Sequence, residues 1–222
     1  IKLKPFFPDA LNNLGNVYNK KMDYERSTYY FKRSINQNKK NSMAFHNLAN
    51  TQRSMGMYKE AIISYKKALE IKPAQIESIS GLGFTYYDVF QNKSGIECFK
   101  LILKMDKKNY YAKRNLAIGY VKTGYFKKAI KLFEETLEKL PNCITSINYL
   151  IQLSSYDTNL DINNLFKKLL LILSYKELNL KKDKTQIITL LGFGRSGSLF
   201  LHSLLDGHPQ ISTLPGYFFK GW

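Results

Sequence analysis

Apolar and small residues recur along the chain with a period of 34 residues. In a frame whose repeats begin at Pro8, Ser42, Ile76 and Tyr110, the seventh position is always leucine and the eighth is always glycine or alanine. The twenty-fourth position is always aromatic, and the residues there are Phe31, Tyr65, Phe99 and Phe133. A register that holds without gaps predicts a stack of similar repeats, each packed against its neighbours.

Each repeat is predicted to consist of two antiparallel helices. The leucine at position seven and the usual tyrosine at position eleven share one helix face, and small residues at positions eight and twenty let the two helices approach closely. Gly56 and Gly124 fall at the turn between the helices, where a positive φ is often required. Pro73 and Pro141 end two of the second helices. The third repeat has Phe90 in place of the turn glycine, so we expect its turn to be the loosest.

This pattern resembles the tetratricopeptide repeat (TPR) and covers about two thirds of the chain. The resemblance implies an all-α superhelical solenoid, here residues 1–157, with repeats from 8, 42, 76 and 110 and a divergent one from 144. Ile1 and Pro5 fit the end of a preceding repeat, so we expect the chain to open inside one. Apolar spacing predicts a capping helix from Asp161 to Ser174, and residues 158–184 are assigned to this helix and a linker.

In TPR proteins the first helices of the repeats line a concave groove, whose sixth position here reads Asn13, Asn47, Gly81 and Asn115. Neighbouring groove positions carry mostly cationic or aromatic side chains, namely His46, Arg53, Tyr87, Arg114 and Lys122. A ladder of asparagines can pair with the backbone of an extended peptide whatever its sequence. The resemblance therefore implies a protein or peptide partner with a partly acidic segment. The alternative is that any exposed helix face must be polar and that asparagine is simply abundant.

A different pattern follows in residues 185–222. Gln186–Leu191 contains adjacent β-branched residues and predicts a short buried strand, which a glycine-rich stretch, Gly192–Ser198, separates from a helix. A strand, glycine-rich turn and helix in this order can direct backbone N–H groups at a phosphate. The loop lacks the lysine of a P-loop nucleotidase, since Ser198 stands there. It also fits the dinucleotide fingerprint, but Asp206 is too early for the expected acidic residue.

A third option places the cation inside the loop, as Arg195, and this arrangement resembles the sulfotransferase loop that binds 3′-phosphoadenosine 5′-phosphosulfate (PAPS). The following Leu204–Pro209 resembles the LLD-x-HP stretch of tyrosylprotein-type and related bacterial enzymes. The resemblance implies that Arg195 contacts the sulfonate and stabilises the leaving phosphate. The backbone amides of the next three residues would hold the 5′-phosphate, and these are Ser196, Gly197 and Ser198.

The resemblance also implies parts that the 222 residues do not contain. The second site, for the 3′-phosphate, is expected beyond Trp222, so the fragment should not turn over substrate alone. No glutamate follows Pro209 where this family has its catalytic base. His202 and His208 could serve as bases, although a packed or solvated helix residue and a turn residue are the plainer interpretations.

Composition limits the remaining classes of function. A net charge of +17 favours acidic partners, but lysines scattered over solvated helix faces are the plainer explanation, because no nucleic-acid motif is present. Cys98 and Cys143 form no metal-binding or disulfide pattern, so we expect no metal site and a cytoplasmic, reducing compartment. The longest apolar run, Leu169–Leu173, is too short to span a bilayer, so no membrane partner is expected.

Together these patterns predict a TPR solenoid followed by the first β-loop-α unit of an α/β, P-loop-like sulfotransferase domain. The parent protein would transfer a sulfonate group from PAPS to a hydroxyl or amine, while the repeats bind a partner. The alternative is a non-enzymatic TPR scaffold for protein–protein interaction.

Overall fold

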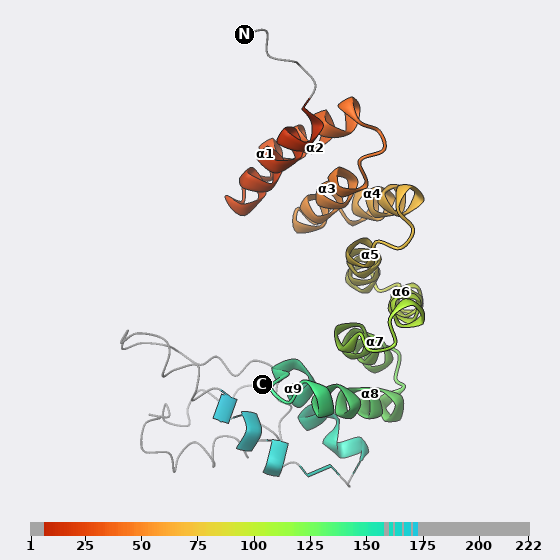
Figure 1. Ribbon diagram of the computed structural model, residues 1–222. Coiled ribbons are helices and arrows are strands. Elements are labelled where there is room, and N and C mark those ends of the chain that lie inside the picture. Colours follow the sequence, from red (N-terminus) through yellow and green to blue (C-terminus); the bar gives the residue numbers. More distant parts are fainter. Residues whose placement is uncertain (1–6, 158–159, 162, 166, 170, 173–222) are drawn as a thin grey trace, which may run out of the picture. The chain divides into compact units, whose positions relative to one another are not determined.

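Paired antiparallel helices follow one another through the computed structural model, which describes residues 7–157, 160–161, 163–165, 167–169 and 171–172. The first helices of the four repeats have 13 residues each and are α1 (Pro8–Lys20), α3 (Ser42–Ser54), α5 (Ile76–Asp88) and α7 (Tyr110–Lys122). The second helices have 14 residues each and are α2 (Tyr24–Gln37), α4 (Tyr58–Ile71), α6 (Asn92–Met105) and α8 (Phe126–Lys139). The helix α9 (Ile144–Leu153) and the 3₁₀ turn η1 (Ser154–Tyr156) come next (Figure 1).

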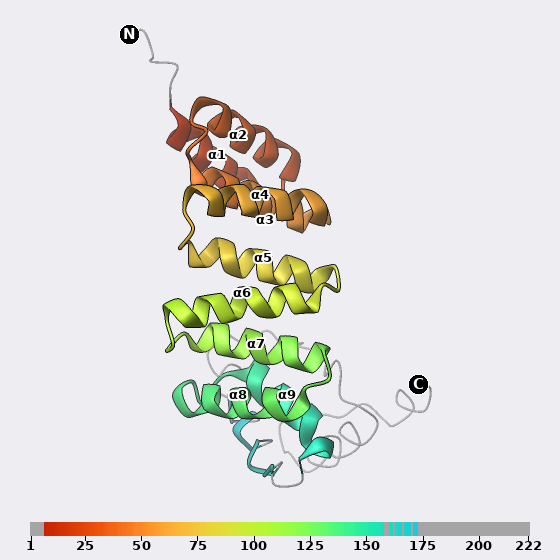
Figure 2. The same ribbon diagram turned by 90° about the vertical axis from the view of Figure 1, so that its right-hand side faces the viewer.

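The chain divides into two compact bodies after Leu132, within α8. We call residues up to Leu132 the N-terminal body and the rest the C-terminal body. In the N-terminal body each helix packs on the next one in the chain, and the first helices α1, α3 and α5 also contact one another. Figure 2 shows the turns inside the repeats on one edge of this body and the turns between repeats on the other.

Small residues bring the two helices of a repeat together, as the sequence predicts. Phe31, Tyr65 and Phe99 are fully buried. A Cβ atom at Gly15 would lie 2.6 Å from the ring of Phe31, and one at Gly83 would lie 2.9 Å from the ring of Phe99. The aromatic ring of the second helix therefore occupies the space that the small residue of the first helix leaves open.

All four turns inside the repeats have the same backbone conformation. Gly56 and Gly124 have φ values of 75° and 79°, which confirms the prediction of positive φ, and Met22 and Phe90 have 59° and 60° at the same repeat position. The amide of Gln91 donates to the carbonyl of Tyr86 at 2.8 Å, as the equivalent residues do in the other three turns. The expected loosening of the third turn is therefore wrong, because Phe90 accepts the left-handed conformation and keeps the hydrogen bond.

Substituting glycine for Phe90 is expected to raise the free energy of unfolding by about 0.5–1 kcal/mol. A left-handed conformation costs a residue with a Cβ atom about 1–2 kcal/mol, and glycine removes this cost. Part of the gain is lost because glycine has more conformational entropy in the unfolded state. Phe90→Ala retains the strain and should change the stability little, since the ring is 84% exposed. Urea unfolding of the three proteins distinguishes these effects, and equal stability of Phe90→Gly and Phe90→Ala would rule out strain at this turn.

The residue before the first helix caps it with its side chain in the second and fourth repeats but not in the first and third. The side chains of Asn41 and Asn109 accept hydrogen bonds from Ala44 N at 3.1 Å and Ala112 N at 2.9 Å. Gln75 holds the same position before α5, but its longer side chain makes no capping bond. Its Oε1 atom is buried and has no hydrogen-bond partner in the part of the chain that the structure describes.

Exchanging asparagine and glutamine at these positions should move the stability in opposite directions. Gln75→Asn is expected to stabilise the protein by about 1 kcal/mol, because it adds a capping bond and removes a buried unpaired acceptor. Asn109→Gln should destabilise it by a similar amount. Thermal and urea unfolding measure both, and a loss of stability in Gln75→Asn would show that the glutamine has a packing role instead.

In the C-terminal body, the rings of Phe133 and Tyr149 stack with their centroids 5.1 Å apart. The described residues between 163 and 172 are helical, and Leu165 and Leu169 are buried. No strand occurs in the described ranges. The predicted strand, loop and helix of residues 185–222, together with most of the linker, lie outside them, so the sulfotransferase unit stays a prediction.

Candidate functional site

Polar side chains bridge the first helices of successive repeats. From α1 to α3, Asn47 Nδ2 donates to Asn12 Oδ1 at 3.0 Å, and Asn19 Nδ2 donates to Thr51 Oγ1 at 2.6 Å. Asn13 is exposed beside them, and Asn50 is exposed one turn beyond Asn47. These amides give the first two repeats a row of hydrogen-bonding groups. We call Asn13, Asn47, Asn50, Arg53 and Asp88 the first-helix face.

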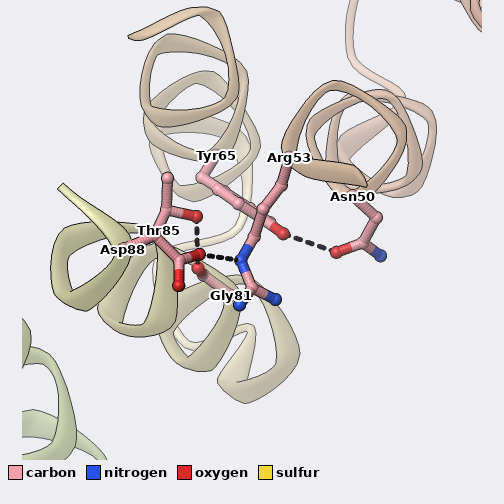
Figure 3. Close-up of polar contacts among 6 residues, drawn as sticks. All are labelled: Asn50, Arg53, Tyr65, Gly81, Thr85 and Asp88. Atoms are coloured by element: carbon pink, nitrogen blue, oxygen red, sulfur yellow. Dashed lines mark hydrogen bonds and ion pairs between the residues drawn. The ribbon is translucent and has the colours of Figure 1, made fainter. Parts of the chain in front are cut away.

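An ion pair joins α3 to α5 in this face. Arg53 Nε lies 2.6 Å from Asp88 Oδ2, and the two side chains are 37% and 30% exposed (Figure 3). The guanidinium carbon lies 5.5 Å from the ring centroid of Phe84, so the cation rests on an aromatic ring. The two terminal nitrogens of Arg53 have no hydrogen-bond partner among the described residues. The face therefore holds one guanidinium in a fixed place with donors still available.

A chain of hydrogen bonds runs beside the ion pair. The Tyr65 hydroxyl donates to Asn50 Oδ1 at 2.5 Å, and Asn50 Nδ2 lies 3.0 Å from His46 Nε2 (Figure 3 shows the first of these). His46 Nδ1 lies 3.0 Å from Ser78 Oγ on α5. Because the amide donates to Nε2, the proton of the neutral imidazole is on Nδ1. The chain fixes the orientation of the exposed Asn50 amide.

Burial changes the acidity of both titratable members of this chain. It raises the pKa of Tyr65 to about 12, a change that Arg53 opposes, so the hydroxyl remains a donor at neutral pH. Burial lowers the pKa of His46 from its ordinary value of 6.5, while the carboxylate of Glu77 opposes the change. The neutral imidazole is therefore the favoured form in the folded protein.

This neutral histidine predicts a loss of stability in acid. The pKa of His46 is lower in the folded than in the unfolded protein, so its contribution is complete above about 6.5 and falls as the pH drops through the folded value. Urea unfolding at pH 7.5 and 5.5 should show a larger loss for the wild type than for His46→Gln, which does not titrate. An equal loss in both proteins would mean that His46 is not responsible.

The predicted asparagine ladder does not continue past the second repeat. Gly81 takes the third position, and a Cβ atom there would lie 2.5 Å from the ring of Tyr65. Asn115, at the fourth position, is only 5% exposed. The Tyr65 ring therefore occupies the space that a side chain at the third position would need, and the fourth amide is buried instead of facing solvent.

The predicted position of Tyr87 is also wrong. The sequence pattern predicts it on the peptide-binding surface, but the structure places it in the hydrophobic core, where it is 6% exposed. Its ring lies against Gly95 and its hydroxyl over Gly119, where a Cβ atom would lie 2.4 Å and 2.1 Å from it. The hydroxyl donates to the Asn115 carbonyl at 3.1 Å. Because Gly95 and Gly119 have no side chains, they leave the space that the Tyr87 side chain fills.

The remaining predicted groove residues, Arg114 and Lys122, lie on α7. The Arg114 guanidinium lies 5.3 Å from the ring centroid of Tyr111, and Lys122 is exposed at the end of α7. The predicted phosphosulfate-binding residues lie outside the described residues, and these are Arg195, Ser196, Gly197 and Ser198. Their roles stay predictions.

The sequence interpretation missed Asn50 and Asp88, and a spacing rule could have found Asp88. Contacts between neighbouring first helices join residues 35 or 32 apart, such as Arg53 with Asp88 and His46 with Ser78. These separations are one more and two fewer than the repeat length, and they differ by nearly one helical turn. An opposite-charge pair 35 residues apart was therefore a readable signal.

The described part of the chain offers no metal site, no membrane span and, at Cys98, no reactive thiol. It contains no cluster of His, Cys, Asp and Glu side chains that could hold a metal ion. None of its helices is both long and apolar enough to cross a bilayer. Cys98 is unpaired, and burial raises the pKa of its thiol to about 11, which keeps it protonated and unreactive.

Comparison with known proteins supports the repeat assignment. Residues 7–74 match the tetratricopeptide repeat family model. The Protein CTR9 homolog of Arabidopsis thaliana is 27% identical over 104 residues, which are 45% of this chain and 10% of that protein. The chain spans about 10–15% of the length of the curated relatives it matches.

Solved structures share the fold. A crystal structure of MamA protein aligns with a TM-score of 0.66 at 19% identity, covering 81% of this chain and 98% of MamA. The structure described as YrrB, a TPR protein with an unusual peptide-binding site, aligns with a TM-score of 0.62 at 16% identity and covers 80% of this chain and 94% of YrrB. With 34-residue helix pairs, a family match over residues 7–74 and the shared fold, the described helices form a tetratricopeptide repeat solenoid.

Proposed function

We propose that the first-helix face binds an extended segment of a partner protein. The supporting observation is the row of amide and guanidinium groups on α1 and α3, which includes Asn13, Asn50 and Arg53. Such groups can pair with the carbonyl and N–H groups of an extended backbone. TPR repeats typically mediate protein or peptide binding, and the similar protein YrrB is described as having a peptide-binding site.

The hydrogen bonds already present prepare this surface for binding. The Asn50 amide is oriented by Tyr65 and His46, and Arg53 is held by Asp88 and Phe84. Side chains that are ordered before binding lose less conformational entropy when a partner arrives. The face therefore combines exposed donors with fixed geometry.

Selection of binders from a displayed library of random dodecapeptides tests this proposal. Peptides selected on the wild type should bind Asn13→Ala and Arg53→Ala roughly 3- to 10-fold more weakly, the effect of losing one or two hydrogen bonds. Asn36→Ala is the matched control, because Asn36 is an exposed asparagine on the second helix α2. Equal losses in all three variants, or none, would refute binding at the first-helix face.

A second candidate function belongs to the C-terminal sequence. We propose that the loop from Gly192 to Ser198 binds the phosphosulfate of PAPS and that the parent protein is a sulfotransferase whose repeats recruit the acceptor. The support is the joint match of this loop and Leu204–Pro209 to the sulfotransferase pattern. In the full-length protein, Arg195→Ala should abolish sulfonate transfer and leave unfolding of the repeats unchanged. Transfer that persists in this variant would remove Arg195 from the mechanism.

A further inference from the structure

The ion pair of the first-helix face belongs to one junction and is not a property of the repeat. At the position of Arg53 the other repeats have Asn19, Tyr87 and Val121. At the position of Asp88 they have Lys20, Ser54 and Lys122. Only between α3 and α5 do a cation and an anion meet at 2.6 Å on this face in the described residues. The pair therefore has to be explained by these two residues themselves.

Stability is a weak explanation for this pair. Both side chains are about one third exposed, and such pairs contribute only about 0–1 kcal/mol. Another exposed pair, Glu97 with Lys100 at 2.8 Å, joins residues three apart on the single helix α6. The Arg53–Asp88 pair instead lies where the proposed peptide would pass.

The pair leaves Arg53 able to donate but without a net local charge. Asp88 contacts Nε and leaves the terminal nitrogens without a partner among the described residues. A neutral carbonyl can accept from those nitrogens at no electrostatic cost. A carboxylate placed there would lie close to the negative charge of Asp88, and like charges at short range oppose binding.

We propose that Asp88 sets the charge selectivity of the first-helix face, so that Arg53 receives a neutral carbonyl of the partner, from its backbone or from an Asn or Gln side chain, in preference to a carboxylate. This inference rests on the proposed peptide-binding function and names the chemistry of its ligand. The net charge of +17 attracts acidic partners over a long distance, whereas Asp88 acts only on the group that Arg53 contacts. The inference therefore differs from the expectation of a partly acidic segment. Phe84 would keep the guanidinium in place if Asp88 lost its charge.

The inference is tested by exchanging Glu and Gln in the peptide and by the substitution Asp88→Asn in the protein. Dodecapeptides selected on the wild type are synthesised with Glu or Gln at each position in turn, and their affinities are measured by fluorescence anisotropy at low salt. At the position that depends on Arg53, the wild type should bind the Gln peptide at least as tightly as the Glu peptide. Asp88→Asn should change the ratio of the two affinities roughly 3- to 10-fold in favour of the Glu peptide, as expected for a partly exposed charge pair.

Two control proteins separate this effect from a general change of charge. Glu97→Gln removes one negative charge from the α6 pair and should leave the ratio unchanged. The double variant Arg53→Gln, Asp88→Asn should lose the preference for Glu. An unchanged ratio in Asp88→Asn, or an equal shift in Glu97→Gln, would overturn the inference while peptide binding itself persisted. If no peptide bound any of these proteins, the proposed function would fail and the inference with it.

Discussion

Replacing Phe99 by alanine is expected to lower the free energy of unfolding by about 3–5 kcal/mol, the usual cost of a large cavity in a core. Phe99 is fully buried, and its ring centroid lies 5.2 Å from that of Phe84 and 5.6 Å from that of Tyr87. These rings come from both helices of the third repeat, so the cavity would weaken the packing of α5 on α6. Urea unfolding followed by circular dichroism measures the loss.

The same helix offers a control for this change. Leu101 lies two residues later on α6 and is 45% exposed, so Leu101→Ala should change the stability by no more than about 0.5 kcal/mol. Because neighbouring repeats stabilise each other, Phe99→Ala should also broaden the unfolding transition as the repeats on either side uncouple. Similar losses for the two variants would contradict the packing of Phe99.

Replacing Gly81 by alanine is expected to destabilise the protein by about 1–3 kcal/mol, although alanine normally favours a helix. The added methyl group would lie 2.5 Å from the Tyr65 ring, which is itself fully buried and cannot move aside without disturbing the core. The free energy of unfolding from urea titration gives the size of the effect. The result would show that the tyrosine ring excludes a side chain from the third position of the ladder.

Removal of Tyr65 should reverse the sign of this effect. In a Tyr65→Ala background the methyl group of Gly81→Ala enters empty space, so only the helix propensity remains and alanine should stabilise by up to about 1 kcal/mol. A cost that stayed the same in both backgrounds would show that the collision with Tyr65 is not its cause.

The helical architecture was predictable because one repeat length governs every helix of the four repeats. The first helices begin at the four residues where the 34-residue frame begins, and α9 begins at Ile144, one repeat after Tyr110. Leucines, small residues and buried aromatics hold this register in all four repeats, so local and tertiary preferences agree. Phe90 is the exception, because its residue type disfavours the turn, yet the packing of the whole repeat holds it in the left-handed conformation.

The binding surface was less predictable, because a repeat position does not fix which way a side chain faces. Tyr87 turns into the core where Gly95 and Gly119 leave a slot, while its counterpart Arg53 reaches the surface and pairs with Asp88. Both outcomes depend on residues in a neighbouring repeat and not on the position within the frame. A ladder of asparagines deduced from one position therefore held only for Asn13 and Asn47, which lie in the first two repeats.

Hydrogen–deuterium exchange of the protein with and without a selected peptide tests the central claim most directly. Binding at the first-helix face should slow exchange in α1, α3 and α5, with the largest change around Asn50 and Arg53, and should leave the outer residues of α2 and α4 unaffected. Slower exchange confined to the second helices, or to residues after Leu132, would place the binding surface elsewhere and contradict the account.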